Sequence, residues 1–242
     1  MHLLSYKQEW NRVIYASVVF LTAEDFLFFG GVRMFRQLRE DIACVKSRDP
    51  AARSALEIYF LYPGLKAIRL HRLANWFYNH KMFFMARWIS QYASKRTGIE
   101  SHPAVQIGKR FFIDHGTGVV IGETAVIGDD VTIYQGVTLG GTGKDTGKRH
   151  PTIGNNVMIG AGAKVLGPLE IGDNSRIAAG AVVLHDIPQN STAVGVPARV
   201  VKKDGIRVDD LNQVDIPDPV AQEIARLEAE IILLKSQINK EN

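Results

Sequence analysis

Aliphatic side chains recur at every sixth position through much of the second half of this 242-residue chain. A glycine or alanine follows most of them, and a second small or aliphatic residue stands four positions after most of them. An amphipathic helix would need spacings of three and four, which this stretch lacks. The pattern predicts a solenoid in which three six-residue units, each a short strand and a corner, close one triangular coil. The repeating positions are Ile121, Ile127, Ile133, Leu139, Ile153, Ile159, Val165, Ile171, Ile177 and Val183.

One interruption breaks this six-residue register. Leu139 and Ile153 are 14 positions apart instead of six, and the extra residues fall in GGTGKDTGKRHP, 140–151. So polar a stretch does not fit an apolar shaft, and it is predicted to leave the solenoid as a loop with Arg149 and His150 at its base. Loops on rigid scaffolds often carry functional residues.

Residues 34–99 have apolar side chains at helical spacing and are predicted to form a helical domain. Residues 1–33 are predicted to be a helical amino-terminal extension. Glu24 and Asp25 interrupt its apolar run, which argues against a membrane-spanning helix and for an amphipathic or buried one. Several aromatic residues of the helical domain are predicted to pack in its core. They are Trp76, Phe77, Phe83, Phe84 and Trp88.

The tail after the repeat has two predicted parts. Residues 202–218 read as a polar linker, and 219–242 as a helix with a coiled-coil-like seam. That helix is expected either to join subunits of an oligomer or to pack on its own subunit. The seam residues are Val220, Ile224, Leu227, Ile231, Leu234 and Ile238.

Composition excludes some classes of function. Cys44 is the only cysteine, which excludes an internal disulfide framework and a multi-thiolate metal site and favours a reducing, cytoplasmic location. The net charge is only +4, with no cluster of five or more basic residues and no zinc-finger spacing. We therefore expect no nucleic-acid partner.

Four motifs tie residues 34–203 to a known family. IDHGTGVVIGETAVIG, LGGTGKDTGKRHP, AVGVPARVV and SRDPAARSALE together closely resemble the serine O-acetyltransferases. Other hexapeptide acyltransferases share the repeat but not the Asp-His pair followed by an Arg-His loop. The resemblance implies an α+β fold in which an amino-terminal helical domain precedes a left-handed parallel β-helix of hexapeptide repeats, here assigned to 100–201, with an extended loop. The carboxy-terminal helix would follow.

The resemblance also implies an activity and an assembly. The family transfers acetyl from acetyl-CoA to the hydroxyl of L-serine, giving O-acetyl-L-serine for cysteine biosynthesis. Acetyl-CoA is then a co-substrate, and neither a permanently bound cofactor nor a metal is expected. Family members assemble as trimers or as dimers of trimers. Many bind O-acetylserine sulfhydrylase through a terminal isoleucine, and because this chain ends in Lys240-Glu241-Asn242 that partner is doubtful.

The catalytic roles can be transferred residue by residue. A serine hydroxyl is a poor nucleophile at neutral pH, so a base must remove its proton as the oxygen attacks the thioester. His115 stands where the family places this base, and imidazole suits the task. Glu100 stands where the family has an aspartate that orients the base, and its side chain is one methylene longer.

The resemblance places both charges of serine as well. Asp49 and Asp114 match the carboxylates that hold the ammonium group, and Arg149 matches the cation that holds the carboxylate. His150 and Glu123 align at the same pocket. Four further residues match positions that contact CoA. They are Gly141, Thr142, Ala161 and Arg176.

Three other interpretations stay open. A hexapeptide acetyltransferase could act on another acceptor such as a sugar, although Arg149 with Asp49 and Asp114 favours a zwitterionic amino acid. A solenoid carbonic anhydrase would need three histidines around zinc, and the histidine spacing here does not supply them. A non-catalytic scaffold would tolerate loss of His115. We expect His102 and His185 to be structural.

Overall fold

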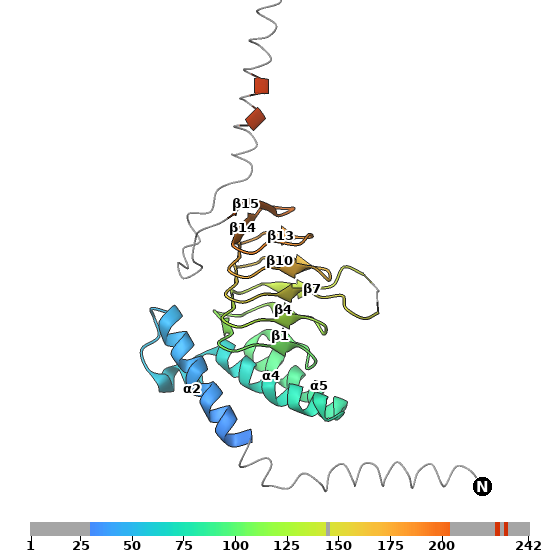
Figure 1. Cartoon of the computed structure of the whole chain (residues 1–242). Helices are drawn as coiled ribbons and strands as arrows, with labels where there is room; N and C mark the ends of the chain where they lie inside the picture. The colour runs from blue at the N-terminus through green and yellow to red at the C-terminus, as the bar shows by residue number, and fades with distance from the viewer. Residues whose placement is uncertain (1–29, 144–145, 204–225, 228–229, 232–242) are drawn as a thin grey trace, which may run out of the picture.

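The computed structural model describes residues 30–143, 146–203, 226–227 and 230–231. Helices lie at one end of a column of short strands, and a loop projects from the side of the column (Figure 1). The helices are α2 (Gly30–Arg48), α3 (Ala55–Leu61), α4 (Pro63–Asn79) and α5 (Phe83–Thr97). None of the described helices is long and apolar enough to cross a membrane.

The strands follow one another around three faces of the column. They are β1 (Ile99–Ser101), β2 (Gln106–Ile107), β3 (Phe112–Ile113), β4 (Val119–Ile121), β5 (Val126–Ile127), β6 (Thr132–Ile133), β7 (Thr138–Gly140), β8 (Thr152–Ile153), β9 (Met158–Ile159), β10 (Lys164–Leu166), β11 (Glu170–Ile171), β12 (Arg176–Ile177), β13 (Val182–Val183), β14 (Ser191–Val194) and β15 (Arg199–Lys203).

Every third strand belongs to the same sheet. Sheet A has the order β1-β4-β7-β10-β13, sheet B the order β11-β8-β5-β2, and sheet C the order β15-β14-β12-β9-β6-β3. Neighbouring coils pair in parallel, and β15 closes the top by pairing antiparallel to β14. The predicted left-handed parallel β-helix of hexapeptide repeats is therefore confirmed.

The repeating aliphatics form the shaft that the sequence predicts. Ile121, Leu139 and Val165 stack in sheet A and are each at most 1% exposed. The second residue of the repeat, four positions after the aliphatic, is also buried. Examples are Val137, which follows Ile133, and Ala163, which follows Ile159. Burying one such aliphatic side chain contributes roughly 1.5–3 kcal/mol, so each coil added to the stack stabilises the column.

The corners between sheets B and C (the B–C corners) have a recurring conformation. One residue of each corner lies in the left-handed region, with φ between 52° and 61°. Three of the five are asparagines, which tolerate this conformation better than most residues. Their side chains form a ladder, because Asn156 Nδ2 donates to Asn174 Oδ1 (2.9 Å) and Asn174 Nδ2 donates to Asn190 Oδ1 (3.0 Å).

The helices begin and end as their sequences direct. Ser54 caps α3 by accepting from the Glu57 N–H at 3.1 Å, and Pro63 occupies the first turn of α4. Gly98 ends α5 at φ 71°, which lets the chain turn directly into β1. Arg72 of α4 donates to Asp41 of α2, which is only 3% exposed, so an ion pair joins the two helices.

The prediction that Phe83, Phe84 and Trp88 pack in the core of the helical domain is wrong for the single chain. Phe83, Phe84 and Trp88 are 53%, 80% and 60% exposed. Helix α5 packs through its small residues, including Ala86 and Ala93, and the helical period places Phe84 and Trp88 on the opposite face.

One predicted domain boundary falls inside a helix, and another lies close to the change from helix to strand. Helix α2 begins at Gly30, so it crosses the boundary expected after residue 33, whereas α5 ends and β1 begins close to the boundary expected after residue 99. Residues 1–29 and the linker after 203 lie outside the described residues. Within 219–242 only 226–227 and 230–231 are described, and both pairs are helical.

His71 of α4 is buried where the helices meet the first coil. Its Nε2 donates to the Val105 carbonyl at 3.2 Å, and its Nδ1 accepts from the Ser101 hydroxyl at 3.0 Å. Burial lowers the pKa of His71 to about 4, so the ring is neutral in the folded protein. Ser90 of α5 also donates to the Ser101 carbonyl at 2.8 Å, which fixes β1 against both helices.

This environment predicts acid sensitivity. Between pH 6.5 and about 4 the unfolded chain binds a proton at His71 that the folded chain does not. The free energy of unfolding should therefore fall as the pH falls, by up to ~3 kcal/mol from this residue alone. Urea unfolding at pH 7 and pH 4.5 measures the slope, and His71→Gln should flatten it. Equal slopes in the two proteins would contradict the assignment.

Candidate active site

The β-helix departs from its register at the first corner between sheets C and A (the C–A corner). Ile113 and Ile121 are eight residues apart instead of six, and the two extra residues belong to DHGTG, 114–118. His115 has φ 57°, and its side chain is 76% exposed. The B–C corners hold other non-glycine residues in this conformation, so the insertion and the exposed ring are what distinguish His115. The insertion presents an imidazole to solvent on a rigid corner.

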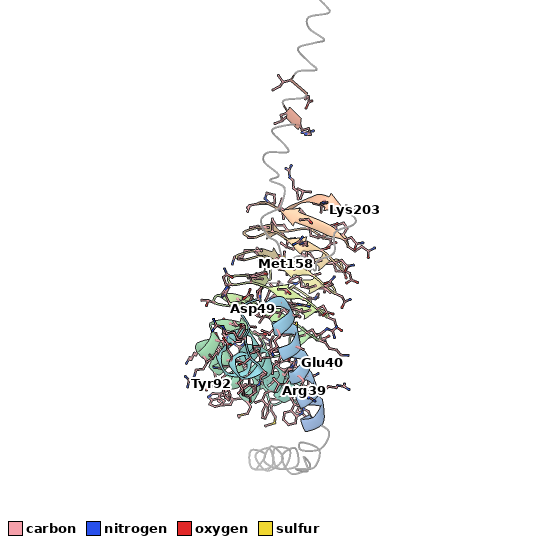
Figure 2. The ribbon with its side chains drawn as sticks, turned by 90° about the vertical axis from the view of Figure 1, so that its left-hand side faces the viewer. Arg39, Glu40, Asp49, Tyr92, Met158 and Lys203 are labelled. Atoms are coloured by element: carbon pink, nitrogen blue, oxygen red, sulfur yellow. The ribbon has the colours of Figure 1, made fainter. Side chains whose placement is uncertain are left out.

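Two carboxylates come together beside this histidine. Asp114 Oδ1 lies 3.9 Å from His115 Nε2, and Asp49, at the end of α2, lies close enough to act on Asp114 electrostatically. Desolvation raises the pKa of Asp114, the His115 charge opposes this rise, and the Asp49 charge adds to it. Figure 2 shows Asp49 at the end of α2 that meets the lower coils. We call Asp49, Asp114 and His115 the acidic corner.

Tyr62 completes the acidic corner, and the sequence patterns did not single it out. Its hydroxyl donates to Asp49 Oδ2 at 2.5 Å. Burial and this hydrogen bond raise the pKa of Tyr62 to about 12, so the hydroxyl keeps its proton at neutral pH. Within the described part of the chain, neither Asp49 nor Asp114 forms an ion pair with Lys or Arg. Two carboxylates held together in this way favour a bound cation.

Glu100 is exposed on β1, at the foot of the same corner. Ile99, the residue before it, packs against Gly116 of the DHGTG insertion, and Glu100 pairs with Val120 in sheet A. No ion pair joins Glu100 to His115 among the residues that the structure describes. Glu100 therefore lies next to the corner in the same sheet as the strand that follows it.

The second departure from the register lies at the corner between sheets A and B (the A–B corner). The loop between β7 and β8 projects there (Figure 1). At its base the Arg149 guanidinium donates to the Glu123 carboxylate, and this hydrogen bond lowers the pKa of Glu123. Both side chains are about one third exposed. We call Glu123, Arg149 and His150 the basic corner.

Thr124 holds the base of this loop, a role that none of the sequence patterns indicates. Its Oγ1 accepts from the backbone N–H of Arg149 at 3.0 Å and of His150 at 3.1 Å. It also lies 2.9 Å from His150 Nδ1, which accepts from the Thr124 N–H at 3.2 Å. Nδ1 is thus an acceptor, and the proton of a neutral His150 lies on Nε2.

Close packing fixes the orientation of His150. A Cβ on Gly122 would lie 2.0 Å from the ring, so only glycine leaves room for the imidazole. Burial lowers the pKa of His150, and the neighbouring Arg149 charge lowers it further. The GETA motif at 122–125 is therefore the part of the corner that seats the Arg-His pair.

His102, predicted to be structural, lies near the basic corner. Burial lowers its pKa, and the charges that act on it include Glu123, Arg149 and Glu100. Its Nδ1 accepts from the Ala104 N–H at 3.2 Å, which gives it a structural role in its own corner. His102 lies in the A–B corner one coil below the GETA motif. The repeat alone therefore predicts that it lies near Glu123.

The residues assigned to CoA divide between the corners. Gly141 and Thr142 begin the projecting loop, and a Cβ on Gly141 would lie 3.1 Å from the Arg149 carbonyl. Ala161 lies at a C–A corner, two coils from His115. Arg176 lies on β12 in sheet C, pairs with Met158 of β9 and is 9% exposed.

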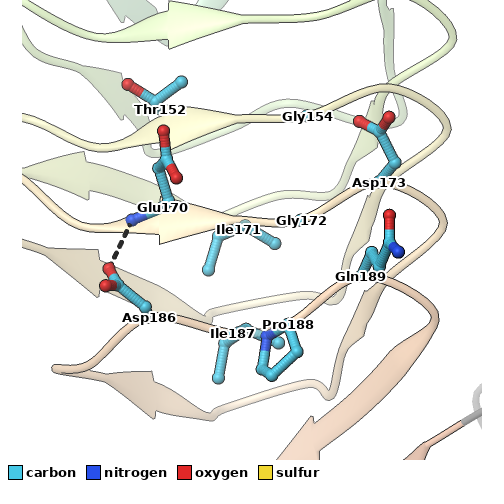
Figure 3. Close-up of a pocket in the computed structure, with 10 residues that line it drawn as sticks. All are labelled: Thr152, Gly154, Glu170, Ile171, Gly172, Asp173, Asp186, Ile187, Pro188 and Gln189. Carbon is cyan, nitrogen blue, oxygen red and sulfur yellow. Dashed lines mark hydrogen bonds between the residues drawn. The ribbon is translucent and has the colours of Figure 1, made fainter.

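A groove runs along the outer face of sheet B (Figure 3). Glu170, Asp173 and Asp186 lie along it, and the Glu170 N–H donates to Asp186 Oδ1 at 2.8 Å. It contains none of the predicted site residues. Within the described residues, no three His, Cys, Asp or Glu side chains gather closely enough to hold a metal ion.

Comparison with known proteins identifies the family. The family model for bacterial transferase hexapeptide (six repeats) matches residues 150–185. Serine acetyltransferase of Bacillus subtilis (strain 168) is 56% identical over 205 residues, which cover 84% of this chain and 94% of that protein. The chain belongs to the serine acetyltransferase family. Its members are acyltransferases, and this chain shares that activity.

Solved structures of serine acetyltransferases agree with this assignment. The enzyme of Brucella abortus strain S19 in complex with coenzyme A is 44% identical, with a TM-score of 0.72 over 75% of this chain and 72% of that chain. The enzyme of Neisseria gonorrhoeae in complex with serine is 40% identical, with a TM-score of 0.68 over 71% of this chain and 70% of that chain.

The Thr124 contacts yield a prediction for this serine acetyltransferase family member. Thr124→Val removes the hydroxyl and leaves two backbone donors and His150 Nδ1 without that partner. We expect the kcat/KM for serine to fall ~10- to 100-fold, because the loop base loosens around Arg149 and His150. Steady-state kinetics measure this, and Thr124→Ser, which keeps the hydroxyl, is the control. Equal losses in both variants would show that the hydroxyl is not responsible.

Proposed function

We propose that this protein transfers acetyl from acetyl-CoA to the hydroxyl of L-serine with His115 as general base. The observation that carries the proposal is the pair of corners: an acidic one that suits an ammonium group and presents an imidazole, and a basic one that suits a carboxylate. Serine is a zwitterion with a hydroxyl, so it needs all three. Relatives in complex with serine and with coenzyme A support the same pair of substrates.

The reaction can be written with these residues alone. His115 takes the hydroxyl proton as the serine oxygen attacks the thioester carbonyl. The new C–O bond forms, the C–S bond breaks, and the proton passes from the imidazolium to the departing CoA sulfur. No acyl-enzyme forms. Glu100, at the foot of the corner, is the carboxylate that we assign to orient the imidazole once substrates are bound.

The two corners lie too far apart in one chain to hold one serine. Sheet A separates them, and a run of about six extended residues spans roughly 15–20 Å. Serine itself is only about 5 Å long. We infer that the basic corner of a second subunit faces the acidic corner of the first, with three such sites in a trimer.

The residues assigned to CoA support this arrangement independently. Ala161 lies at a C–A corner, above His115 by about 10 Å for two coils, whereas Gly141 and Thr142 lie beside the basic corner. The serine residues divide between the same two corners. One subunit boundary would therefore complete both binding sites, and acetyl-CoA would run along it.

The product points to its use. O-acetylation converts the serine hydroxyl into a good leaving group, so the consuming reaction is a replacement at the β-carbon. We assign the enzyme to cysteine biosynthesis, in which a sulfur nucleophile makes that replacement.

The base is tested by His115→Ala. Turnover with acetyl-CoA and L-serine, followed by release of the CoA thiol, should fall by ~10²–10⁴-fold. His185→Ala, an exposed histidine of another coil, is the control and should retain the wild-type rate. Near-normal turnover in His115→Ala would remove the base. Wild-type protein that releases no CoA with serine would defeat the function itself.

The shared site is tested by mixing two inactive variants. Arg149→Ala should raise the serine KM, and at low serine it should be nearly inactive, as should His115→Ala. Co-expressed in equal amounts, the two should recover about a quarter of the wild-type activity, because one boundary in four then combines an intact His115 with an intact Arg149. Activity no higher than that of the separate variants would place each site within a single chain.

A further inference from the structure

The end of α2 is clamped to the β-helix immediately before Asp49. Arg48 Nη1 donates to Thr132 Oγ1 at 2.8 Å, and Nη2 donates to Asp130 Oδ1 at 3.1 Å. Arg110 holds the same Asp130 carboxylate through Nε and Nη2. Only 19% of the Arg48 side chain is exposed, so this is a partly buried network rather than a surface ion pair.

The clamp aligns α2 with the strand that leads to the acidic corner. Thr132 of β6 pairs in register with Phe112 of β3, and β3 ends one residue before Asp114. Phe112 in turn packs in a small core with Val45 of α2. The contacts of Arg48 and Phe112 thus set the position of Asp49 relative to Asp114.

A second contact sets the position of Tyr62. The start of α4 lies directly on β3, and a Cβ on Gly64 would be 2.2 Å from the Ile113 carbonyl oxygen. Only glycine permits this approach. Tyr62 is two residues before Gly64, and the close approach brings its hydroxyl to Asp49.

Asp49 is held at both oxygens. Its Oδ1 accepts from the Ala51 N–H at 2.8 Å, and its Oδ2 accepts from the Tyr62 hydroxyl. Each carboxylate oxygen has a second acceptor site, so the group can still bind a cation. The exposed chain segment after α2 would otherwise leave this carboxylate free to rotate.

We propose that Arg48 and Tyr62 are positioning residues for the amino group of the acceptor. Arg48 fixes the backbone at Asp49, and Tyr62 fixes the carboxylate, so that Asp49 and Asp114 present one preformed ammonium site. The inference rests on the proposed function and deepens it, since it gives the helical domain a direct part in serine binding. A preformed site spares serine the cost of ordering the carboxylates when it binds.

The test compares variants of the full-length protein under steady-state conditions. Tyr62→Phe removes one hydroxyl and keeps the ring, and Tyr59→Phe is its matched control because the Tyr59 hydroxyl bonds to Arg69, away from the corner. Arg48→Met removes the clamp, Arg48→Lys keeps its charge, and Arg36→Met on the exposed part of α2 is the control. For each variant, kcat and the KM of serine and of acetyl-CoA are measured.

We expect the serine KM to rise about tenfold in Tyr62→Phe and at least as much in Arg48→Met. The KM of acetyl-CoA and kcat should stay within about threefold, and Arg48→Lys should recover part of the serine affinity. A serine KM in Tyr62→Phe equal to that of Tyr59→Phe would overturn the proposal. So would a parallel rise in both KM values, which indicates general loosening. Both results presuppose active wild-type protein, whose absence would refute the function instead.

Discussion

Ile121, Leu139 and Val165 stack in a shaft that is closed to solvent, and each coil takes its backbone hydrogen bonds from the coils above and below. That arrangement fixes a period of six residues, because each inward aliphatic must stack on its equivalents in the coils above and below. Any extra residue must leave at a corner, because an insertion within a strand would break both the stack and the hydrogen bonds. The chain has one insertion at a C–A corner and another at an A–B corner, and they carry His115 and Arg149. The rigid repeats thus present His115 and Arg149 at the two corners where residues are inserted.

The distribution of charge follows from this geometry. Glu123 partners Arg149 at one corner, whereas Asp49 and Asp114 share the other corner with a tyrosine and a histidine. A zwitterion would neutralise both corners, but sheet A separates them within one chain. In the trimer that we propose, a second subunit would supply the missing half by symmetry, without any change in the rigid coil. Assembly and catalysis are then the same structural requirement.

The helical domain is attached to the β-helix by specific polar and close-packed contacts. It is joined to the first coils by Arg48, by the approach of Gly64 to Ile113, and by the buried His71 network. Gly64 contacts β3 directly, and Arg48 bonds to Thr132 of β6, which pairs with β3. Strand β3 leads into the acidic corner. A domain that only covered the end of the shaft would need apolar contact alone. Hydrogen bonds at defined positions suit a domain that also orients a functional carboxylate.

Sequence patterns and tertiary structure contributed differently to the site. The motifs predict a site that contains Asp49, Asp114, His115 and Arg149, because their types and order are specific to one family. They could not identify Tyr62 or Thr124, whose roles depend on hydrogen bonds between elements 13 and 26 residues apart in sequence. They also placed Phe84 and Trp88 in a core, since apolar spacing indicates which face is apolar but not which face is covered.

The sequence by itself therefore determined the β-helix, its loop and the family, because the six-residue period is a local pattern that recurs in each repeat. Only the tertiary structure decided which side chains meet. It placed the predicted site residues at two separate corners, brought the end of α2 to the strand before Asp114, and showed that Thr124 seats the Arg-His pair. These contacts depend on the angle at which helices dock and on the order in which coils stack. Both are set by the summed packing of distant segments, which no local pattern encodes.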